Sequence, residues 1–226
     1  MFPDRDRYSD GARAVLPFAA VIAVLGVLLG YTAKEAGFSP AAAATMSATT
    51  FAGGAQFAAI AVLQSGGSVA TAVATAAALN ARYALMGATL APIAGGPLPG
   101  RIALAHLTVD ESWAVAYTEG GKFSRRRLIG AGGVLLVVHV GTTIVGAALG
   151  SALGDATRWG LDAALPSLFL LLLWPRLRHR GDALASLGGA VVALALTPLV
   201  PAGLSVVGAA AAAFIPRLTR VEADDS

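Results

Sequence analysis

Residues 68–92 read SVATAVATAAALNARYALMGATLAP, a long apolar stretch with a single arginine, Arg82, inside it. A helix that crosses a bilayer needs about 20 predominantly apolar residues, so this stretch predicts a membrane-spanning helix. A charge at the centre of a bilayer costs about 2.5–3.5 kcal/mol on insertion scales. We therefore expect Arg82 to be paired, to face water or to serve a function.

The composition of the whole chain agrees with a membrane protein. Of its 226 residues, 56% are hydrophobic and 13% are charged, whereas a soluble domain is typically about 25% charged. Strand-length alternation is absent, which disfavours a membrane barrel. The sequence predicts an all-α, polytopic integral membrane bundle of about 7–8 transmembrane helices, some short or broken. The excess of basic residues is better explained by cytoplasmic loops than by nucleic-acid binding.

Eight apolar segments follow one another along the chain. They are Ala14–Ala33, Pro40–Leu63, Ser68–Ala91, Arg101–Thr118, Leu128–Gly150, Trp159–Trp174, Leu184–Leu199 and Ala202–Ile215. Residues 1–13 are expected to be a cytoplasmic N-terminal segment, 14–216 one helical transmembrane domain and 217–226 a cytoplasmic tail. Ser39 followed by Pro40 predicts an N-cap with proline at the first helical position. Gly26 with Gly30, and the run Gly146, Gly150 and Gly154, predict closely packed helices.

The fourth segment, Arg101–Thr118, is the doubtful crossing because it contains His106, Asp110 and Glu111. If all eight segments cross and the N-terminus is cytoplasmic, three basic residues lie outside: Lys34, Arg101 and Arg158. Twelve lie inside, namely Arg5, Arg7, Arg13, Lys122, Arg125, Arg126, Arg127, Arg176, Arg178, Arg180, Arg217 and Arg220. This bias favours eight crossings with both termini cytoplasmic, with an interfacial or re-entrant fourth segment as the alternative.

The second segment is polar in its middle. On a continuous helical wheel, a stripe within about 80° is formed by Thr45, Thr49, Gly53 and Gln56, with Ser47 and Thr50 off it. The adjacent Gly53 and Gly54 permit a break that exposes backbone groups, as in the discontinuous helices of transporters. Helix packing by Gly53 and a hydrogen bond from Gln56 to a neighbour are the simpler alternatives.

The partner of Arg82 can be argued from depth. On the wheel Arg82 shares a side with Thr71, Thr75 and Met86, and Asn80 points the opposite way. Arg82 lies about ten residues before the loop around Gly95, and Asp110 lies nine residues after Arg101. An ion pair of Arg82 with Asp110 or Glu111 follows, and one carboxylate is left over for proton coupling. A static bridge between two helices is the alternative.

Other chemistry finds little support. His139 stands alone on an apolar helix and is more typical of packing than of a proton relay. No cluster has the spacing of metal ligands, and no glycine-rich phosphate loop with a lysine occurs. We expect no cofactor, no metal and no enzymatic activity.

Three motifs together are similar to those of the AzlC-type branched-chain amino-acid permeases, the large subunits of the AzlCD (LIV-E) exporter family. They are Phe51-Ala-Gly-Gly-Ala-Gln56-Phe57, Asn80-Ala-Arg82 and Thr108-Val-Asp110-Glu111, in that order and spacing. Gly11-Ala-Arg-Ala before Leu16-Pro17 also resembles the start of the family's first helix, and the likeness covers about residues 11–150. Ala55 departs from the small hydroxyl residue more usual there, which bears on substrate preference.

The resemblance implies a secondary exporter of leucine, isoleucine and valine in the bacterial plasma membrane, driven by the proton motive force. It also implies a small membrane partner of the AzlD type. The expected substrate-binding residues are Thr49, Phe51, Gly53, Gly54, Gln56, Asn80 and Arg82, and the expected proton-coupling residues are Asp110 and Glu111. A channel or passive pore for small polar solutes, and a non-transporting assembly subunit, are the alternatives.

Overall fold

The computed structural model describes residues 6–118, 122–150 and 180–199, together with residues 170, 174 and 177. In this part of the chain the regular elements are helical, and the only β-type pairing is an isolated bridge between Tyr117 and Phe123. The predicted all-helical class is confirmed for these residues. The predicted helix Ala202–Ile215, most of Trp159–Trp174 and the tail 217–226 lie outside the described residues.

Several of the described helices are shorter than the predicted segments. They are α1 (Tyr8–Ala14), α2 (Leu16–Glu35), α3 (Pro40–Thr50), α4 (Gly53–Gln64), α5 (Val69–Asn80), α6 (Arg82–Leu90), the 3-10 helix η1 (Ala91–Ile93), α7 (Leu98–His106), α8 (Asp110–Ala116), α9 (Arg125–Leu149) and α11 (Arg180–Leu196). Three predicted segments are thus each divided in two: Pro40–Leu63, Ser68–Ala91 and Arg101–Thr118.

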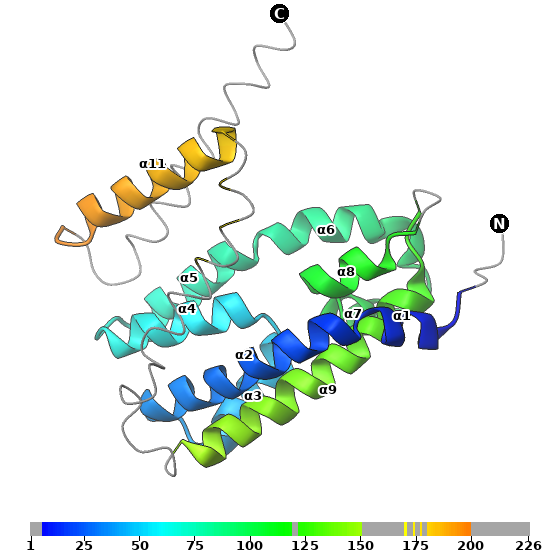
Figure 1. Cartoon of the computed structure of the whole chain (residues 1–226), viewed down its shortest axis with the longest axis horizontal. Helices are drawn as coiled ribbons and strands as arrows, with labels where there is room; N and C mark the ends of the chain where they lie inside the picture. The colour runs from blue at the N-terminus through cyan, green and yellow to red at the C-terminus, as the bar shows by residue number, and fades with distance from the viewer. Residues whose placement is uncertain are drawn as a thin grey trace, which may run out of the picture. The chain divides into compact units, whose positions relative to one another are not determined.

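The chain forms two compact units, residues 1–57 with 79–152 and residues 58–78 with 153–226. In the first unit α9 is the central helix, and α1, α2, α3 and α8 pack along it (Figure 1). In the second unit α11 is apolar, but its apolar part is shorter than a membrane span.

Close contact between α2 and α9 depends on glycine. A Cβ atom at Gly26 would collide with the Thr142 side chain, and one at Gly30 would collide with the α9 backbone at Thr143. From the other side, a Cβ atom at Gly146 would collide with the backbone of α2. The predicted close packing by Gly26, Gly30 and Gly146 is therefore confirmed, because the helix backbones meet where a side chain would stand.

These contacts also fix the direction of the two helices. Val15, at the start of α2, packs in one core cluster with Ala131 near the start of α9. Lys34, near the end of α2, lies against Gly150 just beyond the end of α9. The two helices therefore run parallel, and their N-terminal ends lie at the same end of this unit.

Two helices, α2 and α9, are long and apolar enough to cross a membrane by themselves. A third crossing is added if α5 and α6 through Ile93 count as one interrupted span. The described residues thus contain two or three candidate crossings, and the expected count of seven to eight is not confirmed.

Candidate functional site

The second predicted segment is broken at Phe51 and Ala52. Ser39 caps α3 by accepting a hydrogen bond from the Ala42 backbone N–H, as its position before Pro40 predicted. At the other end of α3, Phe51 has φ 42° and ψ 49°, the left-handed conformation. That conformation is common for glycine at a helix C-terminus but uncommon for a bulky residue. The predicted break is present, although Phe51 makes the turn and the glycine pair begins α4.

The ring of Phe51 explains how this conformation is held. Its centroid lies 5.7 Å from that of His139 on α9 and 6.0 Å from that of His106 at the end of α7. Phe51 is 5% exposed and belongs to the core cluster around α9. A left-handed non-glycine residue costs about 1–3 kcal/mol and is characteristic of functional sites. The break is therefore a strained point fixed by packing between two histidines.

A chain of buried polar side chains bridges the break. The Nε2 of His139 lies 2.9 Å from Gln56 Oε1, and because an amide oxygen only accepts, the histidine donates in this contact. Gln56 Nε2 donates to Ser47 Oγ at 3.5 Å, and Ser47 Oγ donates to Thr143 Oγ1 at 3.0 Å. Thr143 Oγ1 donates to the His139 carbonyl at 2.7 Å. All four residues are at most 3% exposed.

This network joins the last turns of α3 and the first turn of α4 to the middle of α9. His139 is 14 residues beyond Arg125, or about 21 Å along the helix at 1.5 Å per residue. A satisfied buried network makes a core rigid, whereas an incomplete one destabilises it. The side chain of His139, expected to be a packing residue rather than a proton relay, is thus hydrogen-bonded to a predicted substrate-binding residue.

The helical wheel gave the wrong partners for Gln56. The wheel placed Gln56 with Thr45 and Thr49 and left Ser47 off the stripe. In the structure both threonines are exposed and donate to carbonyls of their own helix, Thr45 to Ala41 and Thr49 to Thr45. The wheel assumes that each residue turns the helix by a uniform 100°. The left-handed conformation of Phe51 interrupts this rotation, so the side chains of α4 do not continue the angular order of those of α3. No wheel drawn through the break would place Ser47 beside Gln56.

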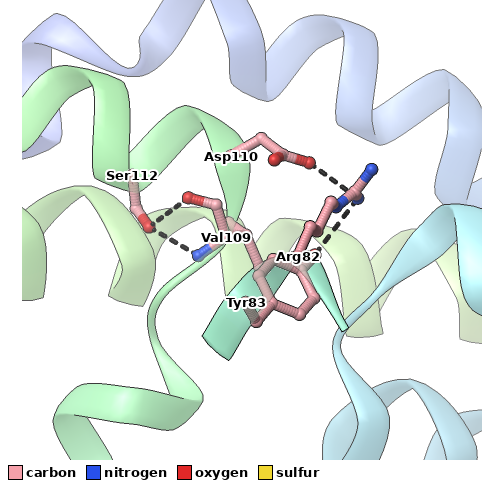
Figure 2. A network of polar contacts seen from close by, with 5 residues as sticks. All are labelled: Arg82, Tyr83, Val109, Asp110 and Ser112. Atoms are coloured by element: carbon pink, nitrogen blue, oxygen red, sulfur yellow. Dashed lines mark hydrogen bonds and ion pairs between the residues drawn. The ribbon is translucent and has the colours of Figure 1, made fainter. Parts of the chain in front are cut away.

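The predicted ion pair of Arg82 with Asp110 is present. Arg82 Nη2 lies 2.7 Å from Asp110 Oδ2, and each side chain is 51% exposed. The same nitrogen donates to the Tyr83 hydroxyl at 3.4 Å, and the guanidinium carbon lies 5.2 Å from the centroid of the Tyr83 ring. Figure 2 shows Arg82 between the carboxylate of Asp110 and the ring of Tyr83. The two charges begin two different helices, α6 and α8, and both can be reached by a ligand.

Ser112 organises the turn that carries Asp110. Its Oγ accepts a hydrogen bond from the Val109 backbone N–H at 2.9 Å (Figure 2). The same Oγ donates to the Leu107 carbonyl at 2.7 Å. Ser112 is fully buried. It therefore satisfies backbone groups at the turn between α7 and α8. Ser112 was not among the predicted site residues.

The remaining predicted residues lie in three kinds of position. Glu111 is half-buried in the first turn of α8, beside Asp110. Gly53 and Gly54 begin α4, and a Cβ atom at Gly53 would stand 4.0 Å from the His139 ring, while one at Gly54 would meet nothing. Asn80 ends α5, and its buried Oδ1 accepts no hydrogen bond within the part of the chain that the structure describes. In that same part, no group of three or more His, Cys, Asp or Glu side chains is arranged to hold a metal ion.

Sequence reasoning missed Ser47, Thr143 and Ser112. Each is a small hydroxyl residue in an apolar helix, where a bond to the preceding turn is the common outcome. Contacts between segments distant in the sequence distinguish Ser47 and Thr143 from Thr45 and Thr49. Ser112 differs because it bonds backbone groups of the turn that precedes its own helix.

Apolar parallel helices and interrupted apolar helices are typical of a helical membrane protein. The chain matches the family model described as "AzlC protein" over residues 17–153. The protein belongs to the AzlC family, a family associated with membrane transport. Searches of the curated proteins and of the solved structures gave no match.

Proposed function

We propose that this protein is the large subunit of a secondary exporter of leucine, isoleucine and valine in the bacterial plasma membrane. Membership of the AzlC family supports a role in membrane transport. The observation that carries the finer proposal is the accessible ion pair of Arg82 and Asp110, whose atoms lie 2.7 Å apart. An amino acid carries the same two charges, and its recognition needs one cation and one anion.

In this proposal the ion pair is the resting state of the substrate site. A zwitterion entering between the two side chains presents its carboxylate to Arg82 and its ammonium group to Asp110. A guanidinium group binds a carboxylate with two parallel hydrogen bonds, so Arg82 keeps a full set of partners after Asp110 is displaced. Substrate binding thereby exchanges one ion pair for two without leaving Arg82 or Asp110 unpaired.

Glu111 supplies the second carboxylate that coupling to protons requires. We propose that Asp110 holds the substrate ammonium group while Glu111 takes up and releases a proton as the site opens to each side. A carboxyl group takes up a proton more readily when a second negative charge lies beside it or when water solvates it poorly. Glu111 is half-buried and adjacent to Asp110 in the sequence, which meets both conditions.

The residues at the helix break form the second part of the proposed site. Phe51 provides apolar surface, Gly53 and Gly54 leave the backbone open at the start of α4, and Gln56 is fixed by His139. We propose that they, with Thr49 and Asn80, select and position the apolar side chain and the polar groups of the substrate. The energy source is the proton motive force, and a small AzlD-type membrane subunit completes the transporter.

Counterflow in proteoliposomes tests this function. Vesicles containing the chain with its small partner, loaded with unlabelled leucine, should transiently accumulate external labelled leucine. Loading with isoleucine or valine should give the same overshoot, and loading with lysine or glutamate should give none.

The alternatives give different results in the same assay. A channel lets label equilibrate without an overshoot, and its flux does not respond to an imposed pH gradient. An assembly subunit gives no flux with or without the partner. Either outcome would refute the carrier, and overshoot driven only by other amino acids would refute the branched-chain substrate.

A further inference from the structure

The basic start of α9 holds a distant loop. The guanidinium group of Arg125 donates to the carbonyl of Ile93 at 3.3 Å and also to that of Gly95. These carbonyls belong to the end of η1 and to the loop that leads into α7. The loop between α6 and α7 therefore lies at the N-terminal end of α9.

The end of α8 lies at the same place. Ser124, the residue before α9, donates its backbone N–H to the Ala116 carbonyl at 2.9 Å. Arg127 donates from Nε to the Val115 carbonyl at 3.1 Å. Both ends of the predicted crossing Arg101–Thr118 are thus attached to the first turn of one helix.

The turn between α7 and α8 lies at an intermediate depth. The carbonyl of Leu107 stands where a Cβ atom of Gly132 would be, so the turn packs directly on the α9 backbone. Gly132 is seven residues beyond Arg125, or about 10 Å along α9 at 1.5 Å per residue. The hydrocarbon core of a bilayer is about 30 Å thick, so this turn reaches roughly a third of the way across.

We propose that α7 and α8 form a re-entrant hairpin that enters the membrane from the face holding Lys122–Arg127 and returns to the same face. The predicted fourth crossing is then not a crossing. Asp110, which begins α8, then lies near the inner end of this hairpin.

The distribution of charge agrees with this topology. Arg126 donates to the carbonyl of Asp6 at 3.4 Å, so the N-terminal segment lies at the same face. Lys34 lies at the opposite end of α9, beside Gly150. Since α2 leaves this face and Ile93 is back at it, one of the two interrupted segments between them crosses and the other returns. The α5–α6 pair is apolar and long enough to be a span when its two helices are counted together, and the proposal assigns the crossing to it.

Accessibility of single cysteines tests the hairpin, because the chain has no native cysteine. Gly95→Cys places a thiol in the exposed α6–α7 loop, where a Cβ atom meets nothing within 4 Å. Lys122→Cys and Glu35→Cys are exposed references at the N-terminal end of α9 and at the end of α2. Intact cells are treated with a membrane-impermeant maleimide, and the free thiols are counted after permeabilisation.

The hairpin predicts that Gly95→Cys and Lys122→Cys are labelled under the same condition and that Glu35→Cys is labelled under the opposite one. Labelling of Gly95→Cys together with Glu35→Cys would establish a full crossing and overturn the proposal. So would protection from either side of both Gly95→Cys and a second variant in the exposed first turn of α7, Pro99→Cys. The readout requires no transport, so it is independent of the substrate proposed above.

Discussion

Removal of Arg82 separates a static bridge from a transport site. The Arg82–Asp110 pair is short, at 2.7 Å, but each side chain is 51% exposed. Exposed pairs typically contribute between 0 and about 1 kcal/mol to stability. For a chain of 150–250 residues, about 1 kcal/mol corresponds to a change in Tm of about 2–4 °C. We therefore expect Arg82→Ala to lower Tm by no more than that while abolishing export.

The measurements are thermal unfolding of the purified protein in detergent and counterflow in proteoliposomes, with Arg101→Ala on the exposed surface of α7 as the matched control. The double variant Arg82→Asp with Asp110→Arg keeps an ion pair but exchanges the positions of its charges. A static bridge tolerates the exchange, whereas a site that orients a zwitterion does not. Export by Arg82→Ala, or its recovery in the exchanged pair, would refute the proposed role.

Two further predictions concern the interior. Gln56→Leu removes the partner of His139 and should cost about 1–3 kcal/mol in unfolding free energy because buried polar groups lose their hydrogen bonds. Thr49→Val removes a hydroxyl bonded only within its own helix and should change stability by less than about 0.5 kcal/mol, so equal effects on Tm would contradict the network. Gly30→Ala should destabilise by about 1–3 kcal/mol, since its Cβ atom meets the α9 backbone. As the control, a Cβ atom at Gly141 meets nothing within 4 Å, so Gly141→Ala should raise the unfolding free energy by up to about 1 kcal/mol. A Gly30→Ala protein with the Tm of the native chain would show that α2 and α9 are not in contact.

The ion pair of Arg82 was predicted by comparing distances along the chain, and this comparison does not depend on the number of crossings. Arg82 and Asp110 lie at similar chain distances from the one loop between η1 and α7. Two helical segments that leave the same loop reach similar depths whether the second crosses or turns back. The sequence therefore predicted the ion pair correctly while leaving the path of the fourth segment undecided.

The charges of the loops do not by themselves establish eight crossings. The excess of basic residues requires only that the N-terminal segment and Lys122–Arg127 share a face. Four crossings between them satisfy this condition, and so do two crossings with two segments that turn back. The charge of a loop indicates only on which side of the membrane that loop lies. The loop charges therefore indicate whether the number of crossings between two loops is even or odd, and not how many crossings there are.

The amino-acid sequence by itself determined a helical membrane protein, a break near Gly53 and Gly54 and an ion pair of Arg82 with Asp110 or Glu111. These follow from hydropathy, from local backbone preference and from distance along the chain. Tertiary structure alone decided that Gln56 bonds His139 and lies near Ser47, and that Arg125 holds the loop at Gly95. For Gln56 the physical reason is that the left-handed Phe51 changes the direction of the side chains of α4 relative to those of α3. Contacts between distant segments are then set by packing on α9, which no local pattern encodes.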